Sequence, residues 1–125
     1  MKLFTLEEAN ALLPAARKIL LRIKRARQRL AAFSSQAKLA AENAEQGGGG
    51  MPDGIRYANL LTQFTSEIAE LDSLGVQLKD FDRGLIDFPS LRDGRVVLLC
   101  WQLGEGDELE WWHDVDAGFA GRTPL

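Results

Sequence analysis

The stretch RVVLLCW at residues 95–101 decides how the chain folds. It is almost wholly apolar, so both of its faces must be covered, which is typical of a strand in the middle of a sheet. The turn residues Asp93 and Gly94 precede it, and the glycine-containing segment 104–107 follows it. Residues 108–113 then predict a neighbouring strand, so the chain reverses direction on both sides of the central strand.

Further strands are predicted upstream of this centre. Residues 76–82 alternate between apolar and polar, and residues 85–88 form a short apolar run that Pro89 should end. In the strand at 108–113, alternation places one set of side chains on one face (Leu109, Trp111, His113) and another on the opposite face (Glu108, Glu110, Trp112). We therefore expect a small antiparallel β-meander in the C-terminal part, residues 76–125.

The N-terminal half has helical signals. Thr5 and Glu8 form a capping box that starts a helix near residue 6. Pro14 lacks the amide that an uninterrupted helix needs, so we expect a short helix over 6–12 followed by a long one. The long helix carries one apolar stripe, made of Leu13, Ala16, Leu20, Ile23, Leu30 and Phe33.

A second helix is predicted over residues 55–74. Its apolar positions recur at spacings of four and three (Tyr57, Leu61, Phe64, Ile68, Leu71), and Gly75 follows as the C′ residue. The Gly-rich segment 47–54 should be a connecting loop. It is not a phosphate-binding loop, because the lysine and hydroxyl residue that would open the next helix are missing.

These elements predict an α+β fold for a single domain over residues 1–125. A helical hairpin at 5–75, with a short N-terminal helix and the Gly-rich loop 47–54, packs on the β-meander. The chain has no run of about 18 apolar residues, so no membrane segment is expected. Its single cysteine suits a reducing, cytoplasmic compartment.

Charge is distributed unevenly. Residues 1–41 hold nine Lys/Arg and two acids, a balance of +7, whereas residues 42–125 hold six and sixteen, a balance of −10, which together give the net −3. The basic helix at 17–29 could contact nucleic acid, but the pI of about 5.2 and the lack of interleaved aromatic residues argue against it. We instead expect the basic segment to lie against acidic residues, within the chain or across a homodimer.

His113 is the first candidate for chemistry. Together with Glu105 and Asp87 it could perform acid–base catalysis, and with Asp114 and Asp116 it could bind a divalent metal, for which a carboxylate-rich set favours Mg²⁺ or Mn²⁺. A lone histidine at the end of a strand beside two tryptophans is more often a packed or capping residue, and this is the interpretation that the sequence favours. Cys100 lies in an apolar strand, where burial should leave the thiol inert.

Arg122 is the second candidate. It follows Gly118 and Gly121, which allow close backbone approach, and its guanidinium could hold a carboxylate or phosphate. Asp82 and Trp112 are the other residues that we assign to a ligand site. The interpretation that we favour is a structural arginine paired with an aspartate of a preceding turn.

Several motifs together resemble a known family: residues 4–10 (FTLEEAN), 79–80 (KD), 84–89 (GLIDFP), 99–101 (LCW) with 104–105 (GE), 112–113 (WH), and 118–122 (GFAGR) with Pro124. The family is a small bacterial one, domain of unknown function 2203. The resemblance spans nearly the whole chain and implies a one-domain bacterial cytoplasmic protein. It transfers no catalytic residue, because none is assigned in the family.

Three functions follow as hypotheses. The favoured one is a homo-oligomeric protein-interaction module, because the long helix exceeds the second helix in length and should offer its surplus apolar stripe to another copy. The second is a small metal-binding protein or acid–base enzyme centred on His113 and Glu105, with Arg122 holding an anion. The third is nucleic-acid binding through the helix at 17–29.

Overall fold

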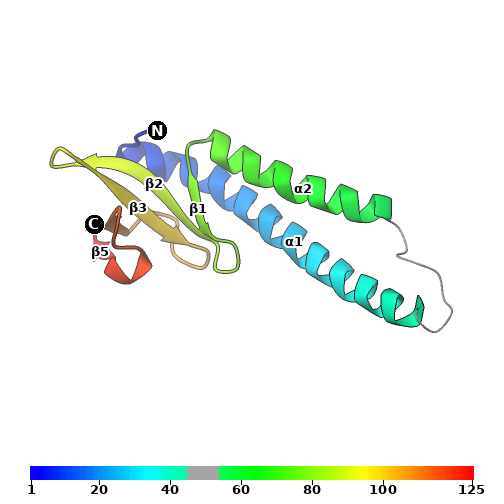
Figure 1. Cartoon of the computed structure of the whole chain (residues 1–125). Helices are drawn as coiled ribbons and strands as arrows, with labels where there is room; N and C mark the ends of the chain where they lie inside the picture. Colours follow the sequence, from blue (N-terminus) through cyan, green and yellow to red (C-terminus); the bar gives the residue numbers. More distant parts are fainter. Residues whose placement is uncertain (45–53) are drawn as a thin grey trace.

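The computed structural model describes residues 1–44 and 54–125. Two helices precede a five-stranded antiparallel sheet of strand order β1-β2-β3-β4-β5, which confirms the α+β class and the meander (Figure 1). The elements are α1 (Leu6–Ala44), α2 (Gly54–Ser73), β1 (Gln77–Asp80), β2 (Leu85–Arg92), β3 (Arg95–Gln102), β4 (Trp111–Asp114), the 3₁₀ helix η1 (Phe119–Gly121) and β5 (Thr123–Pro124). The loop predicted for 47–54 lies outside the described residues, except that Gly54 begins α2.

The start of α1 follows the predicted capping box. The Thr5 amide donates to Glu8 Oε1 at 2.9 Å, and the Glu8 amide donates to Thr5 Oγ1 at 3.1 Å. The prediction of two helices separated near Pro14 is wrong, because α1 runs without a break through this residue. Pro14 is exposed, while Leu13 and Ala16 on either side of it are buried in the core. Packing of this continuous apolar face offsets the loss of one helical hydrogen bond.

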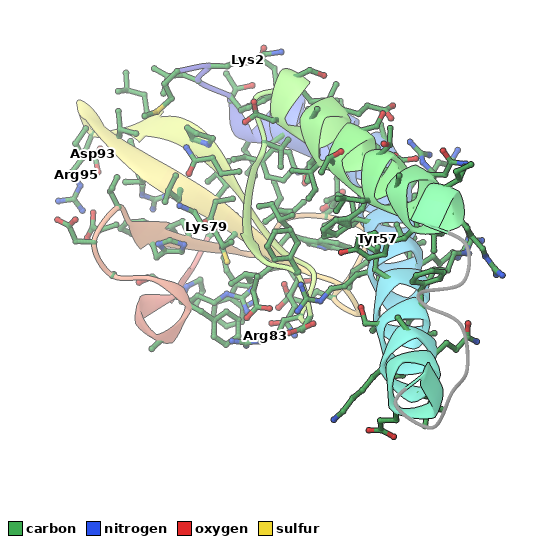
Figure 2. The ribbon with its side chains drawn as sticks, turned by 45° about the vertical axis from the view of Figure 1, so that its right-hand side comes forward. Lys2, Tyr57, Lys79, Arg83, Asp93 and Arg95 are labelled. Atoms are coloured by element: carbon green, nitrogen blue, oxygen red, sulfur yellow. The ribbon has the colours of Figure 1, made fainter. Side chains whose placement is uncertain are left out.

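The two helices lie side by side and run in opposite directions (Figure 1). Contacts between them follow an antiparallel order: Arg22 of α1 bonds Glu67 of α2, and Phe33 of α1 packs on Tyr57. Figure 2 shows Tyr57 where α2 faces α1. In α2 the apolar stripe differs from the expected one by a residue, because Leu60 is half-buried and Leu61 is 42% exposed. No described helix is long and apolar enough to cross a bilayer.

Strand β2 continues through Pro89 to Arg92, so the expectation that Pro89 ends it is wrong. The Pro89 carbonyl accepts from the Phe4 amide at 2.7 Å, on the side of β2 away from β3. In a strand the amide and the carbonyl of one residue point the same way. The donor that proline lacks is therefore not needed by the β2–β3 ladder.

Strand β4 begins at Trp111, three residues later than predicted. The Leu109 amide donates to Asn10 Oδ1 on α1 at 2.7 Å, and this bond takes Leu109 out of the sheet. Its side chain is buried in the same core that Trp112 packs against, not on the Trp111 side as alternation suggested. Strand β5 and η1 have no counterpart among the predicted elements.

The sheet has two different faces. On the face toward the helices, Ile86 and Phe88 of β2 and Leu99 and Trp101 of β3 form the core with α1. The intervening residues of each strand must point the other way. On that outer side the C-terminal segment with η1 covers the sheet, away from α2 (Figure 1).

Candidate functional site

The outer face of the sheet carries a cluster of three ionisable side chains: Asp87 of β2, Cys100 of β3 and His113 of β4. Asp87 and Cys100 lie directly opposite each other in the β2–β3 register, and His113 lies opposite Leu98, the outward-facing residue two positions before Cys100. The exposed fractions of the three residues are 1%, 0% and 3%. Groups of this kind are costly to bury unless they are partnered.

The two nitrogens of His113 both face oxygen atoms. Nδ1 lies 2.7 Å from the carbonyl oxygen of Asp114, and Nε2 lies 3.1 Å from Asp87 Oδ1. A carbonyl oxygen can only accept, so Nδ1 must carry a hydrogen. In a neutral imidazole Nε2 would then be a bare lone pair facing a carboxylate, and the contact requires a proton or another cation between the two groups.

Cys100 completes the cluster as a protonated thiol in the metal-free protein. Burial is the main cause that raises the pKa of the Cys100 thiol from 9.0 to about 12, and the negative charge of Asp87 adds to it, while Arg122 acts in the opposite direction. The expectation of an inert thiol agrees with this pKa. His113 has no free nitrogen to act as a base toward it, so a cysteine nucleophile does not fit.

The potential ligand atoms of Asp87, Cys100 and His113 lie within 4.8 Å of one another. They offer one oxygen, one sulfur and one nitrogen. Three protein ligands of this mixed kind are typical of zinc, whereas Mg²⁺ and Mn²⁺ prefer oxygen alone.

The structure places the other proposed metal ligands elsewhere. The Asp114 carboxylate pairs with Arg95 at 3.1 Å, and this residue contributes only its backbone carbonyl to the cluster. Figure 2 shows Arg95 and Asp93 at the end of the β2–β3 hairpin. Asp116 is exposed in the following turn. Of the three expected ligands, only His113 therefore belongs to the cluster.

Glu105 and Arg122 form a second, adjoining pair. One Arg122 nitrogen, Nη2, donates to both Glu105 oxygens at 2.8 and 2.7 Å, and the Gln102 amide donates to Glu105 Oε1 at 2.7 Å. The Arg122 guanidinium also lies over the rings of Trp111 and Phe119, 4.8 and 4.7 Å from their centroids. The arginine thus has an acidic partner, which is Glu105 and not an aspartate of a preceding turn.

The three expected ligand-binding residues do not share one site. Asp82 is exposed and pairs with Arg27 of α1 at 2.9 Å. Trp112 points to the helix side of the sheet, with Arg92 4.7 Å from its ring centroid and its Nε1 without a hydrogen-bond partner among the described residues. Arg122 packs on Trp111, which faces the opposite side.

The fold and the cluster define a small α+β protein with a buried polar centre on the outer face of its sheet. The chain belongs to the family DUF2203, described as an uncharacterized conserved protein, whose model matches residues 2–125. This confirms the resemblance found in the sequence motifs. No curated protein and no solved structure matches the chain.

Proposed function

We propose that the protein binds a divalent transition-metal ion, with Zn²⁺ the best match, through Asp87, Cys100 and His113. The observation that carries the proposal is the position of His113 between two acceptor atoms. A metal ion would satisfy both the Nε2 lone pair and the Asp87 carboxylate.

The surroundings of His113 support a ligand role. Metal-bound histidines usually donate their second ring hydrogen to a carbonyl or carboxylate, which fixes the ring and its tautomer, and the Asp114 carbonyl accepts such a bond here. Cys100 would lose its proton on binding, which removes the cost of forming a thiolate beside Asp87. When bound, Zn²⁺ would supply positive charge at the point where His113 Nε2 and the Asp87 carboxylate face each other.

The degree of burial indicates what kind of site this is. All three side chains are at most 3% exposed, and the C-terminal segment lies on their side of the sheet. Three protein ligands would leave one zinc position for water, but burial of this degree would keep a substrate away from that position, so we expect the metal to act in stability.

Metal binding can be tested with Co²⁺ and Zn²⁺ on protein purified with a chelator and then dialysed. Co²⁺ should bind once per chain and produce thiolate-to-cobalt absorption, which Zn²⁺ then displaces. Cys100→Ser should abolish this absorption, and His113→Gln and Asp87→Asn should each weaken binding ~10-fold or more. The matched controls are Asp114→Asn and Asp116→Asn, which change carboxylates that lie outside the cluster.

Two results would contradict the proposal. One is a folded wild-type protein that takes up neither ion. The other is binding that the two control variants weaken as much as the cluster variants do, because the ligands would then be the carboxylates beside His113.

A further inference from the structure

A hollow of about 360 Å³ lies on the helix side of the protein, between α1 and the loop that joins β3 to β4. Its lining is partly apolar (Leu13, Pro14, Leu21 and Trp101) and partly made of exposed charged residues and loop backbone (Arg17, Lys18, Gly106 and Asp107). Leu21 is 36% exposed although it belongs to the helix that builds the core. Pro14 and Leu21 therefore form an apolar strip that is open to solvent beside charges of both signs, while Leu13 and Trp101 in the lining are each 1% exposed.

The walls of this hollow are held in place by hydrogen bonds. The Trp101 indole donates to the Gly106 carbonyl at 2.9 Å, and the Glu105 amide donates to the Gln102 carbonyl at 3.0 Å. The loop is tied to α1 by the bond from the Leu109 amide to Asn10 Oδ1. A partner would therefore bind to a preformed surface, and little conformational entropy would be lost in ordering the loop.

The charges at the rim are at most weakly paired within the described part of the chain. Arg17 approaches Asp107 only to 3.6 Å, and the two side chains are 50% and 96% exposed, so their attraction is weak. Lys18 has no acidic partner within the described residues. By contrast, Arg22 on the same helix bonds to Glu67 and Glu70 of α2 at 2.9 and 3.1 Å.

The layout is basic on α1, apolar in the middle and acidic on the loop, where exposed Glu108 follows Asp107. A surface of this kind is complementary to itself when it is rotated by 180° about an axis through the apolar strip, which is the condition for a two-fold symmetric interface. We propose that a second copy of this chain occupies the hollow, with Arg17 and Lys18 of one copy against Asp107 and Glu108 of the other.

This surface differs from the one that the helix lengths suggested. The apolar stripe from Leu13 to Phe33 was expected to remain uncovered, but Leu13, Ala16, Leu20, Ile23 and Phe33 are all buried within one chain. A homodimer that forms through this part of α1 would therefore use the outer side of the helix. The interface does not involve the metal ligands, so its test is independent of metal binding.

Sedimentation of two charge-reversed variants tests the proposal. The first is Arg17→Glu with Lys18→Glu, and the second is Asp107→Lys with Glu108→Lys. Each alone places like charges face to face and should weaken self-association at least ~10-fold relative to wild type. An equimolar mixture of the two should form a heterodimer, because the opposite charges face each other again. Lys38→Glu with Lys79→Glu makes the same charge change as the first variant outside the hollow and is the matched control.

Three outcomes would overturn the proposal. The wild-type protein could remain a 13.8 kDa species up to ~100 µM, a concentration at which only weak complexes stay dissociated. A dimer could form equally well in both reversed variants, which would place the interface elsewhere. Finally, the two variants could each be folded by circular dichroism and monomeric, yet fail to associate when mixed.

Discussion

At the residue scale, the Cys100 thiol is controlled by its burial. Its raised pKa of about 12 means that almost no thiolate exists near neutral pH in the metal-free protein. An alkylating reagent added with a chelator should therefore leave Cys100 unmodified in the native state and modify it after unfolding, as measured by intact mass. Rapid native labelling would show that the outer face of the sheet opens often.

The same pKa has a consequence for stability. The folded pKa lies above the unfolded value of 9.0, so the folded state retains the proton more strongly. The contribution of the Cys100 thiol to the free energy of unfolding is fully present below pH 9 and is lost as the pH rises toward about 12. Urea unfolding of wild type and Cys100→Ala at increasing alkaline pH should show the wild type losing more stability, and parallel curves would contradict this.

Arg122 allows a third prediction at this scale. It is 10% exposed and its partner Glu105 is 25% exposed, so the pair is only partly buried. Arg122→Ala should reduce the free energy of unfolding by ~2–3 kcal/mol, somewhat less than the loss of a fully buried partner, because Glu105 keeps the Gln102 amide and some solvent. A double-mutant cycle with Glu105→Gln in urea measures the coupling. Two stable variants that have lost binding of the same small anion would instead indicate a ligand site.

At the scale of elements, local patterns predicted the start of α1, the helix α2 and the order of β1 to β4, because capping and periodicity act over a few residues. They failed at Pro14 and at Pro89. Pro89 is tolerated because its backbone faces away from β3, toward the Phe4 amide 85 positions away, and Pro14 is tolerated because Leu13 and Ala16 beside it pack in the core with the sheet. The cluster was predicted only in part for the same reason. The sequence indicated His113 and Asp87, but the contact with Cys100 follows from the register of β2 on β3.

Turn glycines provide a graded prediction for the sheet. Gly84 has φ +64°, and a Cβ there would lie 2.6 Å from Leu103 Cγ, whereas Gly94 has φ +78° with open space around it. Gly94→Ala should cost only the backbone strain, ~1–2 kcal/mol. Gly84→Ala adds a collision with Leu103 and should cost ~3 kcal/mol or more. Gly54→Ala is the control, because a Cβ at Gly54 has no atom within 4 Å and the residue has no positive φ. Urea unfolding measures the loss of stability of each variant, and a different order of the three losses would contradict this prediction.

At the scale of the whole molecule, α1 takes part in two different environments. Its first half packs on the sheet, with Ala9, Leu13, Ala16 and Leu20 at most 2% exposed. Its second half contacts α2, where Phe33 is the last described residue of α1 to be buried. The apolar surface that α1 buries therefore decreases from its first half to its second half.

Hydrogen exchange should reveal this gradient. Amides of α1 at residues 13–26 should exchange only through unfolding of the core, whereas those at residues 34–39 should exchange at least ~100-fold faster, because few buried contacts oppose local opening there. The measurement is native-state exchange followed by NMR or peptide mass at a protein concentration low enough to keep the chain monomeric. Uniform protection to residue 39 would contradict the gradient, since a helix segment without buried side chains would then be as stable as the core.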